Sequence, residues 1–215
     1  MNQHYFSTAP SGDFTPREIE VELAGATRRL VTAGGVFSPE HLDEGTRLLL
    51  AVCDARDTAD VDTADVDEDR AAPQSILDIG CGWGPIALAA ALRHPDATVW
   101  AVDVNERARE LTAMNAARLG LTNVRVAAPD EVPADITFDA IRSNPPIRVG
   151  KQMLHDILER WLPRLTAKGS AQLVVAKHLG ADSLQRWLSE TFAELTVARI
   201  ARDKGFHVLE AVRSA

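Results

Sequence analysis

The sequence predicts a doubly wound α/β domain with a mostly parallel, seven-stranded sheet, an antiparallel edge strand and a short N-terminal extension. Three observations predict this fold. After Pro73, short apolar runs alternate with segments of helical periodicity. A glycine-rich turn follows the first of these runs, where a doubly wound fold passes from a strand into a helix. The chain then ends in two strand-like runs joined by Asp203-Lys204-Gly205, which is a hairpin signal.

The composition is that of a globular protein without a membrane span. The 215 residues are 46% apolar and 25% charged, and no apolar run approaches the ~20 residues that a transmembrane helix needs. The first residues have neither the basic flank nor the apolar stretch of a secretory signal. The two cysteines, Cys53 and Cys81, and the six scattered histidines have no metal-ligand spacing. We therefore expect a cytoplasmic protein with no metal site and no membrane partner.

The negative charge is concentrated in one segment. Residues 54–70 hold eight acidic side chains against Arg56 and Arg70, so this segment accounts for −6 of the formal net charge of −8. The rest of the chain is nearly neutral, so the composition is compatible with a local basic surface that binds nucleic acid. Residues 54–73 lack large apolar side chains, which predicts a flexible loop. An acidic strip that binds a partner is the alternative.

The N-terminal extension, residues 1–53, is expected to contain a hairpin and a helix that pack on the following domain. Residues 18–23 alternate between acidic and apolar side chains, which is the period of a strand. Ala24-Gly25 is suited to a turn into a second strand through residues 30–32. Residues 42–52 then have the pattern of a short helix with one buried side.

The domain expected to bind a ligand spans residues 74–215. Its expected strands cover residues 75–79, 98–102, 124–126, 138–141, 171–176, 195–202 and 206–212. Its expected helices run from the glycine turn to residue 93 and over residues 106–119, 152–162 and 183–188. Strand and helix alternate until the final hairpin, so the sheet should be parallel except at that edge.

A glycine-rich run, Asp78-Ile79-Gly80-Cys81-Gly82-Trp83-Gly84, links the first strand of this domain to a helix. Glycines in such a turn let the backbone approach a ligand where a Cβ would clash. A nicotinamide-binding turn reads G-x-G-x-x-G, whereas these glycines recur at every second residue and Pro85 stands where the third would be. Asp78 is better suited to an amino-acid moiety than to a pyrophosphate.

An acidic residue ends the next strand. Asp103 lies 23 residues after Gly80, where doubly wound folds place a carboxylate that accepts hydrogen bonds from both ribose hydroxyls. The alternative is a cap for the helix that begins near Asn105. At this spacing from the glycine run we favour the ribose-binding role.

A short motif, Ser143-Asn144-Pro145-Pro146-Ile147, follows the fourth strand. The prolines stiffen the loop, so that the amide of Asn144 and the carbonyl of Pro146 point at one spot. Two fixed acceptors can hold both hydrogens of an exocyclic amine and direct its lone pair at an electrophilic methyl group. A plain turn is the alternative, but the glycine run and Asp103 at their spacings favour the amine-binding interpretation.

Together these motifs resemble the amino-methylating branch of class I S-adenosylmethionine-dependent methyltransferases. Residues 34–38, Leu42-Asp43-x-Gly45 and residues 48–50 resemble the segment that precedes the glycine run in the methyltransferase small domain group. Within that group the chain is most similar to the 16S ribosomal RNA guanine-N2 methyltransferases. The resemblance covers residues 34–213, with the acidic segment as an insertion.

The resemblance implies a Rossmann-like catalytic domain that methylates guanine N2 in ribosomal RNA, free or in the small ribosomal subunit. The implied cofactor is S-adenosylmethionine, which leaves as S-adenosylhomocysteine. The residues implied to bind it are Phe37, Asp78, Gly80, Cys81, Gly82, Gly84, Asp103, Val104, Ala128 and Asn144. The residues implied to act on the acceptor are Asn144, Pro145, Pro146 and Ile147. Arg148 and Lys151 follow directly and are candidates for contacting a substrate phosphate, with solvated loop charges as the alternative.

Two features depart from the family pattern and leave other substrates open. Ile147 stands where the family has an aromatic residue that stacks on the target base, a contact worth ~1–3 kcal/mol per base. Longer members also have a second, non-catalytic half for which this chain has no room. Protein-glutamine and DNA-adenine methyltransferases use the same Asn-Pro-Pro motif, and a non-catalytic assembly factor that binds the cofactor is a further alternative. We favour the ribosomal RNA enzyme, with the oligomeric state open and a monomer favoured.

Overall fold

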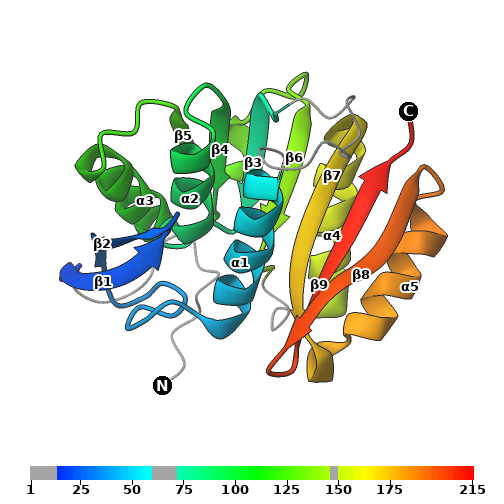
Figure 1. The fold of residues 1–215 in the computed structure, drawn as a ribbon, viewed down its shortest axis with the longest axis horizontal. Helices are drawn as coiled ribbons and strands as arrows, with labels where there is room; N and C mark the ends of the chain where they lie inside the picture. Colours follow the sequence, from blue (N-terminus) through cyan, green and yellow to red (C-terminus); the bar gives the residue numbers. More distant parts are fainter. Residues whose placement is uncertain (1–13, 60–71, 146–149) are drawn as a thin grey trace.

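The computed structural model describes residues 14–59, 72–145 and 150–215 of the chain. Their main feature is a sheet with the strand order β5-β4-β3-β6-β7-β9-β8 (Figure 1). Its strands are β3 (Ser75–Ile79), β4 (Thr98–Val102), β5 (Val124–Ala127), β6 (Phe138–Ser143), β7 (Leu165–Ala176), β8 (Leu195–Asp203) and β9 (Phe206–Arg213). The strands from β5 to β7 pair in parallel, whereas β9 is antiparallel to both β7 and β8. The predicted doubly wound fold, with antiparallel pairing at one edge, is confirmed.

The strand order places a reversal between β3 and β6. The chain continues from β3 to β4 and β5 in one direction, and from β6 to β7 in the other. Ligands of open α/β sheets bind at such a reversal, beyond the carboxyl ends of the strands. The glycine run follows β3, Asp103 follows β4 and Asn144 follows β6. The topology therefore collects the three predicted motifs at one edge of the sheet.

Helices cover both faces of the sheet (Figure 1). One face carries α1 (Glu44–Ala59), α2 (Pro85–Arg93) and α3 (Glu106–Arg118), and the other carries α4 (Lys151–Trp161) and α5 (Ala181–Thr191). Short 3₁₀ turns occur at Pro129–Glu131, Leu162–Arg164 and Lys177–Leu179. Side chains of β3 alternate between the two layers, because Leu77 belongs to the core with α4 and α5 whereas Ile76 belongs to the core with α2. None of the described helices is both long and apolar enough to cross a membrane.

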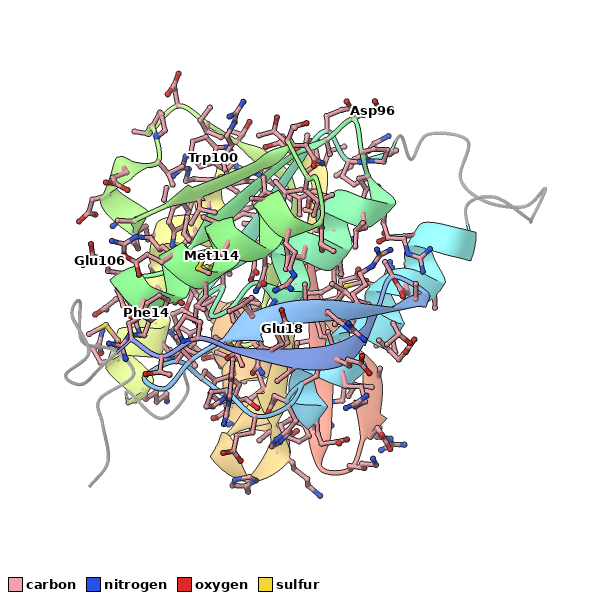
Figure 2. All side chains as sticks on the ribbon, turned by 90° about the vertical axis from the view of Figure 1, so that its left-hand side faces the viewer. Phe14, Glu18, Asp96, Trp100, Glu106 and Met114 are labelled. Carbon is pink, nitrogen blue, oxygen red and sulfur yellow. The ribbon has the colours of Figure 1, made fainter. Side chains whose placement is uncertain are left out.

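The N-terminal extension forms the predicted hairpin, which lies beside α3 (Figure 2). β1 (Arg17–Leu23) and β2 (Ala26–Thr32) pair antiparallel in a sheet of their own. The turn residues, Ala24-Gly25, have φ angles of 52° and 80°, which give the twist that a two-residue hairpin needs. The Asn115 side chain of α3 donates to the carbonyl of Val31 at 2.8 Å and accepts from its N–H at 2.7 Å. These two bonds attach the hairpin to the main domain.

Helix α1 is longer than the sequence predicted. It continues to Ala59, so residues 54–59 are helical and the prediction of a flexible loop from residue 54 is wrong. The reason is a set of distant partners, since Asp57 accepts two hydrogen bonds from Arg142 of β6 at 2.9 and 3.0 Å. Polar side chains that suggested a solvated loop are thus bound to the sheet. The rest of the predicted acidic loop, residues 60–71, lies outside the described residues.

Candidate active site

The glycine run forms an open turn between β3 and α2. Gly80 and Gly82 have φ angles of 76° and 58°, a left-handed conformation that residues with a Cβ rarely adopt. The N–H groups of Gly80 and Cys81 donate to the carbonyl oxygen of Val102 at 2.8 and 3.0 Å, which bends the turn toward the end of β4. A Cβ built at Gly80 or Gly82 would meet no described atom within 4 Å. The turn therefore faces a space in which a ligand can contact the backbone.

Asp78 is a buried carboxyl group with one unused oxygen. Only 1% of the residue is exposed. Its Oδ2 accepts a hydrogen bond from the N–H of Ala87 at 3.0 Å, whereas its Oδ1 has no partner among the described residues. Burial raises the pKa of Asp78 to about 8, with Asp103 adding to the rise and Ala87 and Arg142 opposing it. A cationic ligand group at Oδ1 would supply the missing partner and favour the carboxylate form.

Asp103 connects the end of β4 to the glycine run. Its Oδ2 accepts from the N–H of Gly82 at 3.0 Å, and its Oδ1 accepts from the N–H of Asn105 at 2.9 Å. Burial raises the pKa of Asp103, while these backbone N–H groups oppose the rise. The helix cap is Asn105, because its side chain accepts from the N–H of Arg107 at the start of α3. Each Asp103 oxygen retains a lone pair that can accept from a ligand hydroxyl.

The segment of residues 34–38 lies across the same edge of the sheet. Its carbonyl oxygens accept hydrogen bonds from Asn105 Nδ2 at 2.8 Å, Arg107 Nη1 at 2.7 Å and Trp83 Nε1 at 3.2 Å. These donors belong to the glycine run and the start of α3, so the segment is held beside both. Phe37, within the segment, is 48% exposed. Its ring is therefore available to contact a ligand at this edge.

Two further residues predicted to bind the cofactor follow neighbouring strands. Val104 comes two residues after the end of β4 and is 42% exposed, and Ala128 comes directly after β5. The N–H of Asp103 donates to the carbonyl oxygen of Ala127 at 3.4 Å, which continues the pairing of the two strands to their ends. Val104 and Ala128 therefore lie at the same edge as the glycine run.

Cys81 contributes its backbone to the turn, and its thiol is unreactive. Cys53 and Cys81 are both free and buried. Burial raises the pKa of Cys53 to about 11 and the pKa of Cys81 well above its ordinary value, so both thiols stay protonated. Within residues 14–59, 72–145 and 150–215, no group of three or more His, Cys, Asp or Glu side chains is placed to hold a metal ion.

The amide of Asn144 is held in one orientation. Its Nδ2 donates to Asp43 Oδ2 and to Thr46 Oγ1, each at 2.9 Å, so both amide hydrogens are used. Its Oδ1 remains as an acceptor. The hydroxyl of Ser143 donates to the carbonyl oxygen of Ile79 at 2.7 Å, which joins the end of β6 to the start of the glycine run. Asn144 therefore presents a fixed carbonyl oxygen beside that run.

Asp43 and Thr46 are site residues whose role the sequence did not reveal. Asp43 precedes α1, and its Oδ2 also accepts from the N–H of Thr46 at 3.1 Å, as an N-cap does. One carboxylate oxygen thus starts α1 and holds Asn144, which lies 101 residues further along the chain. The sequence analysis placed Asp43 inside an expected helix that began at residue 42, so its capping role was missed, and its contact with Asn144 depends on the fold.

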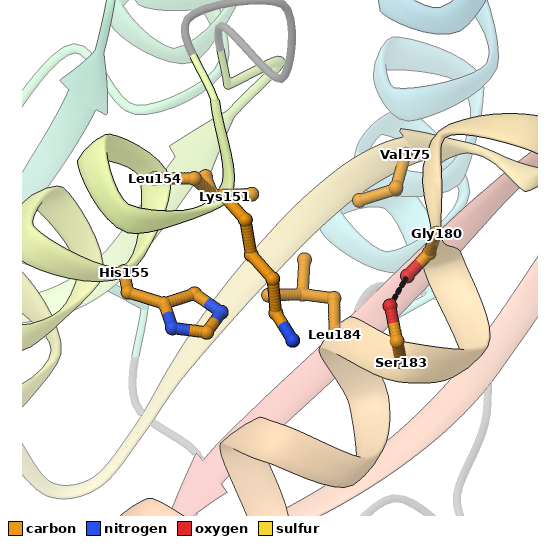
Figure 3. Close-up of a pocket in the computed structure, with 7 residues that line it drawn as sticks. All are labelled: Lys151, Leu154, His155, Val175, Gly180, Ser183 and Leu184. Carbon is orange, nitrogen blue, oxygen red and sulfur yellow. Dashed lines mark hydrogen bonds between the residues drawn. The ribbon is translucent and has the colours of Figure 1, made fainter.

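Some of the other residues predicted to act on the acceptor amine or to contact a substrate phosphate lie outside the described residues. Pro145 is buried at the end of β6, whereas Pro146, Ile147 and Arg148 lie outside the described residues. Lys151 is exposed and begins α4. It lines a small pocket between α4 and α5, beside the carboxyl end of β7 (Figure 3).

Comparison with known proteins gives a family match over most of the chain. Residues 27–210 match the family model of the methyltransferase small domain. The chain is 36% identical over 214 residues to the uncharacterized protein YbxB of Bacillus subtilis, a match that covers 98% of each protein. It is 29% identical to the ribosomal RNA small subunit methyltransferase C of Shewanella amazonensis, over 92% of this chain and 55% of that relative. The chain thus spans about half the length of the named ribosomal RNA methyltransferase.

Solved structures share the fold. A 16S rRNA N2 methyltransferase of T. thermophilus, in complex with AdoMet and guanosine, matches with a TM-score of 0.73 and 22% identity, over 94% of this chain and 51% of that one. A ribosomal protein L11 methylase of Lactobacillus delbrueckii subsp. bulgaricus matches with a TM-score of 0.60 and 22% identity, over 81% and 85% of the two chains. The family match and the relative from B. subtilis go beyond fold: this chain belongs to the methyltransferase small domain family, whose methyl donor is S-adenosylmethionine.

Proposed function

We propose that the chain is a cytoplasmic enzyme that transfers a methyl group from S-adenosylmethionine to the exocyclic N2 amine of guanine in small-subunit ribosomal RNA. The observation that carries the proposal is the orientation of Asn144, whose Nδ2 is fully engaged and whose Oδ1 is left to accept. This oxygen lies at the edge of the sheet where Asp78 has an unused oxygen for a cationic ligand. The choice of guanine N2 follows the named relatives, of which the chain spans about half.

The residues at this edge fit the parts of S-adenosylmethionine. Asp78 Oδ1 suits its ammonium group, and the open backbone of the glycine run suits its methionine chain. Asp103 suits the ribose hydroxyls, because both of its oxygens retain a lone pair. The residues proposed to surround the adenine are Phe37, Val104 and Ala128. When bound, the cofactor supplies an electrophilic methyl group on a sulfonium.

The acceptor side is proposed to work by positioning. Asn144 Oδ1 accepts one hydrogen of the guanine amine, and the carbonyl of Pro146, outside the described residues, accepts the other. Holding both hydrogens directs the nitrogen lone pair at the methyl group, and a fixed acceptor needs no reorganisation as positive charge develops on the nitrogen. The surplus proton then leaves to solvent, so the chain needs no strong base. Asp43 and Thr46 act through Asn144 by fixing its amide.

The test is the Asn144→Ala variant in single-turnover methylation of small ribosomal subunits with saturating cofactor. We expect the rate to fall ~10²–10³-fold, as for loss of one preorganised polar group in other active sites. The dissociation constant of the cofactor should change far less, because Asp78, Asp103 and the glycine run are untouched. An unaltered rate would contradict the role of Asn144.

The nature of the product separates this proposal from its alternatives. Methyl label recovered as N2-methylguanosine in ribosomal RNA supports it. Label on a glutamine side chain or on DNA adenine would show that the chain methylates another acceptor by the same chemistry. Cofactor binding without transfer to any RNA, protein or DNA fraction would identify a cofactor-binding assembly factor.

A further inference from the structure

A small pocket lies between the first turns of α4 and α5, over the carboxyl end of β7 (Figure 3). Its volume is about 110 Å³. A cavity of roughly 10–15 Å³ already holds one water molecule. The pocket therefore has room for a small polyatomic ion. Its polar lining is Lys151, His155 and Ser183, and its apolar lining includes Leu154, Val175 and Leu184.

His155 lines this pocket with an imidazole that is held in one orientation. The residue is 9% exposed, and neither ring nitrogen is hydrogen-bonded within the part of the chain that the structure describes. Its imidazole stacks on the Trp187 ring with centroids 3.6 Å apart and planes 12° apart, which fixes its orientation. Figure 3 shows the ring on the same side of the pocket as the Lys151 amine. Because His155 lines the pocket, its ring nitrogens are free to bind a ligand there.

Lys151 and the starts of two helices provide positive charge at the pocket. Lys151 makes no ion pair within the described residues. Burial is the main cause that lowers the pKa of His155 and Lys151 is the next, whereas Glu159 and Asp156 oppose the shift. Asp182, the acid in the first turn of α5, is paired with Arg199. Both helices begin here without a side-chain cap, so their first N–H groups add partial positive charge.

The pocket also flanks the proposed acceptor site. β7 is the neighbour of β6 in the sheet, and Asn144 directly follows β6. The pocket therefore lies beyond Asn144 on the side away from β3 and the glycine run. A nucleic-acid strand whose target base reaches Asn144 would pass beside it.

We propose that this pocket binds a backbone phosphate of the substrate RNA next to the target nucleotide, with Lys151, His155 and Ser183 as its side-chain ligands. This inference rests on the proposed function. Lys151 supplies the charge and His155 donates one ring N–H. The hydroxyl of Ser183, now donating to the carbonyl oxygen of Gly180 at 2.8 Å, can turn to donate to the phosphate. A phosphate held here sets the position of the strand and so the position of the target base.

The test compares Lys151→Ala and His155→Phe with wild type, and uses Arg186→Ala as the matched control. Arg186 is an exposed cation on α5 that does not line the pocket. In methylation of small-subunit ribosomal RNA, we expect each pocket variant to raise the KM for RNA by about tenfold. Lys151→Ala should also reduce the salt slope, which is the slope of log RNA affinity against log salt concentration, by about 1. The cofactor dissociation constant should not move. His155→Phe keeps an aromatic ring to stack on Trp187, and circular dichroism checks its fold.

The outcomes separate this proposal from the function on which it rests. If wild type methylates RNA while both pocket variants match Arg186→Ala in KM and salt slope, the phosphate site is wrong and the function stands. If the wild-type chain methylates only protein, both the proposed function and the proposed site for an RNA phosphate are wrong. Inorganic phosphate provides an independent probe, because its binding should move the NMR signals of the His155 ring in wild type and less in Lys151→Ala. Phosphate binding without any effect of the variants on RNA would assign the pocket to a free anion and overturn the proposal.

Discussion

Asp57 of α1 is mostly buried and Asp78 of β3 is completely buried. The charge of Arg142 acts on both, yet their pKa values shift in opposite directions. Burial raises the pKa of Asp57, but His94 and Arg142 outweigh it and the net shift is downward. Asp57 lies 3.1 Å from His94 Nε2 and accepts two hydrogen bonds from Arg142. Asp78 accepts one bond, from the N–H of Ala87, and burial raises its pKa to about 8.

The two carboxyl groups differ in where their partners lie. Asp57 has its partners within the protein, so its charge helps to hold α1 on the sheet. Asp78 Oδ1 has no partner within the part of the chain that the structure describes, so burying this oxygen lowers the stability of the ligand-free protein. An incompletely paired carboxyl group at the reversal point of the sheet is the kind of group that a cationic ligand completes. Three substitutions test this contrast.

The largest effect is expected from Asp57→Ala. Arg142 is only 5% exposed, so removal of Asp57 would leave a buried guanidinium without its carboxylate. We expect the free energy of unfolding to fall by about 3–5 kcal/mol, measured by urea denaturation at neutral pH. The matched control is Asp54→Ala on the same helix, whose pair with Arg93 is about one-third exposed and should contribute less than ~1 kcal/mol. Similar losses in both variants would show that Asp57 contributes no more to stability than the more exposed Asp54.

The second effect is a pH dependence of cofactor affinity that comes from Asp78. Below about pH 8 the ligand-free protein keeps a proton on Asp78, and binding of an ammonium group expels it. Affinity should therefore rise toward pH 8 by up to about tenfold per pH unit, and level off as the ammonium itself begins to lose its proton. Asp78→Asn should bind more weakly near pH 8 and lose this slope in calorimetry. If the pH dependence persists in the variant, a group other than Asp78 causes it.

The same proton affects folding of the ligand-free protein. Between about pH 4 and pH 8 the folded chain keeps a proton on Asp78 that the unfolded chain releases. Its contribution to the free energy of unfolding therefore declines as pH rises through this range. Asp78→Asn should remove that decline, which provides a readout independent of the cofactor.

The smallest of the three effects is expected from Asp103→Asn. The amide retains one oxygen to accept from a ribose hydroxyl or a backbone N–H, but it loses the charge. Weakening of one charge-assisted hydrogen bond corresponds to a roughly tenfold loss of affinity for S-adenosylmethionine. Calorimetry at pH 8 measures it, and unchanged affinity would remove Asp103 from the cofactor site.

Much of the fold could be predicted because its signals are local. Residues 75–79 and 98–102 were predicted as strands with the bounds that β3 and β4 have, since each is a short apolar run that ends at an acid or glycine turn. The hairpin at Ala24-Gly25 followed from the alternation of residues 18–23 and from the turn residues themselves. In contrast, the C-terminal part of α1 was missed, because its stability depends on strands that the segment itself does not contain.

Residue types alone set the backbone of the glycine run and the order of the motifs along the chain. Positive φ angles and strand–helix alternation follow from residue types within a few positions. The tertiary structure alone decided which polar groups meet: Asn144 with Asp43, 101 residues apart, and Asp57 with Arg142, 85 residues apart. It also decided that Asp78 Oδ1 stays unpaired among the described residues. The physical reason is that a hydrogen bond needs atoms about 3 Å apart, and for residues distant in sequence only packing sets that distance.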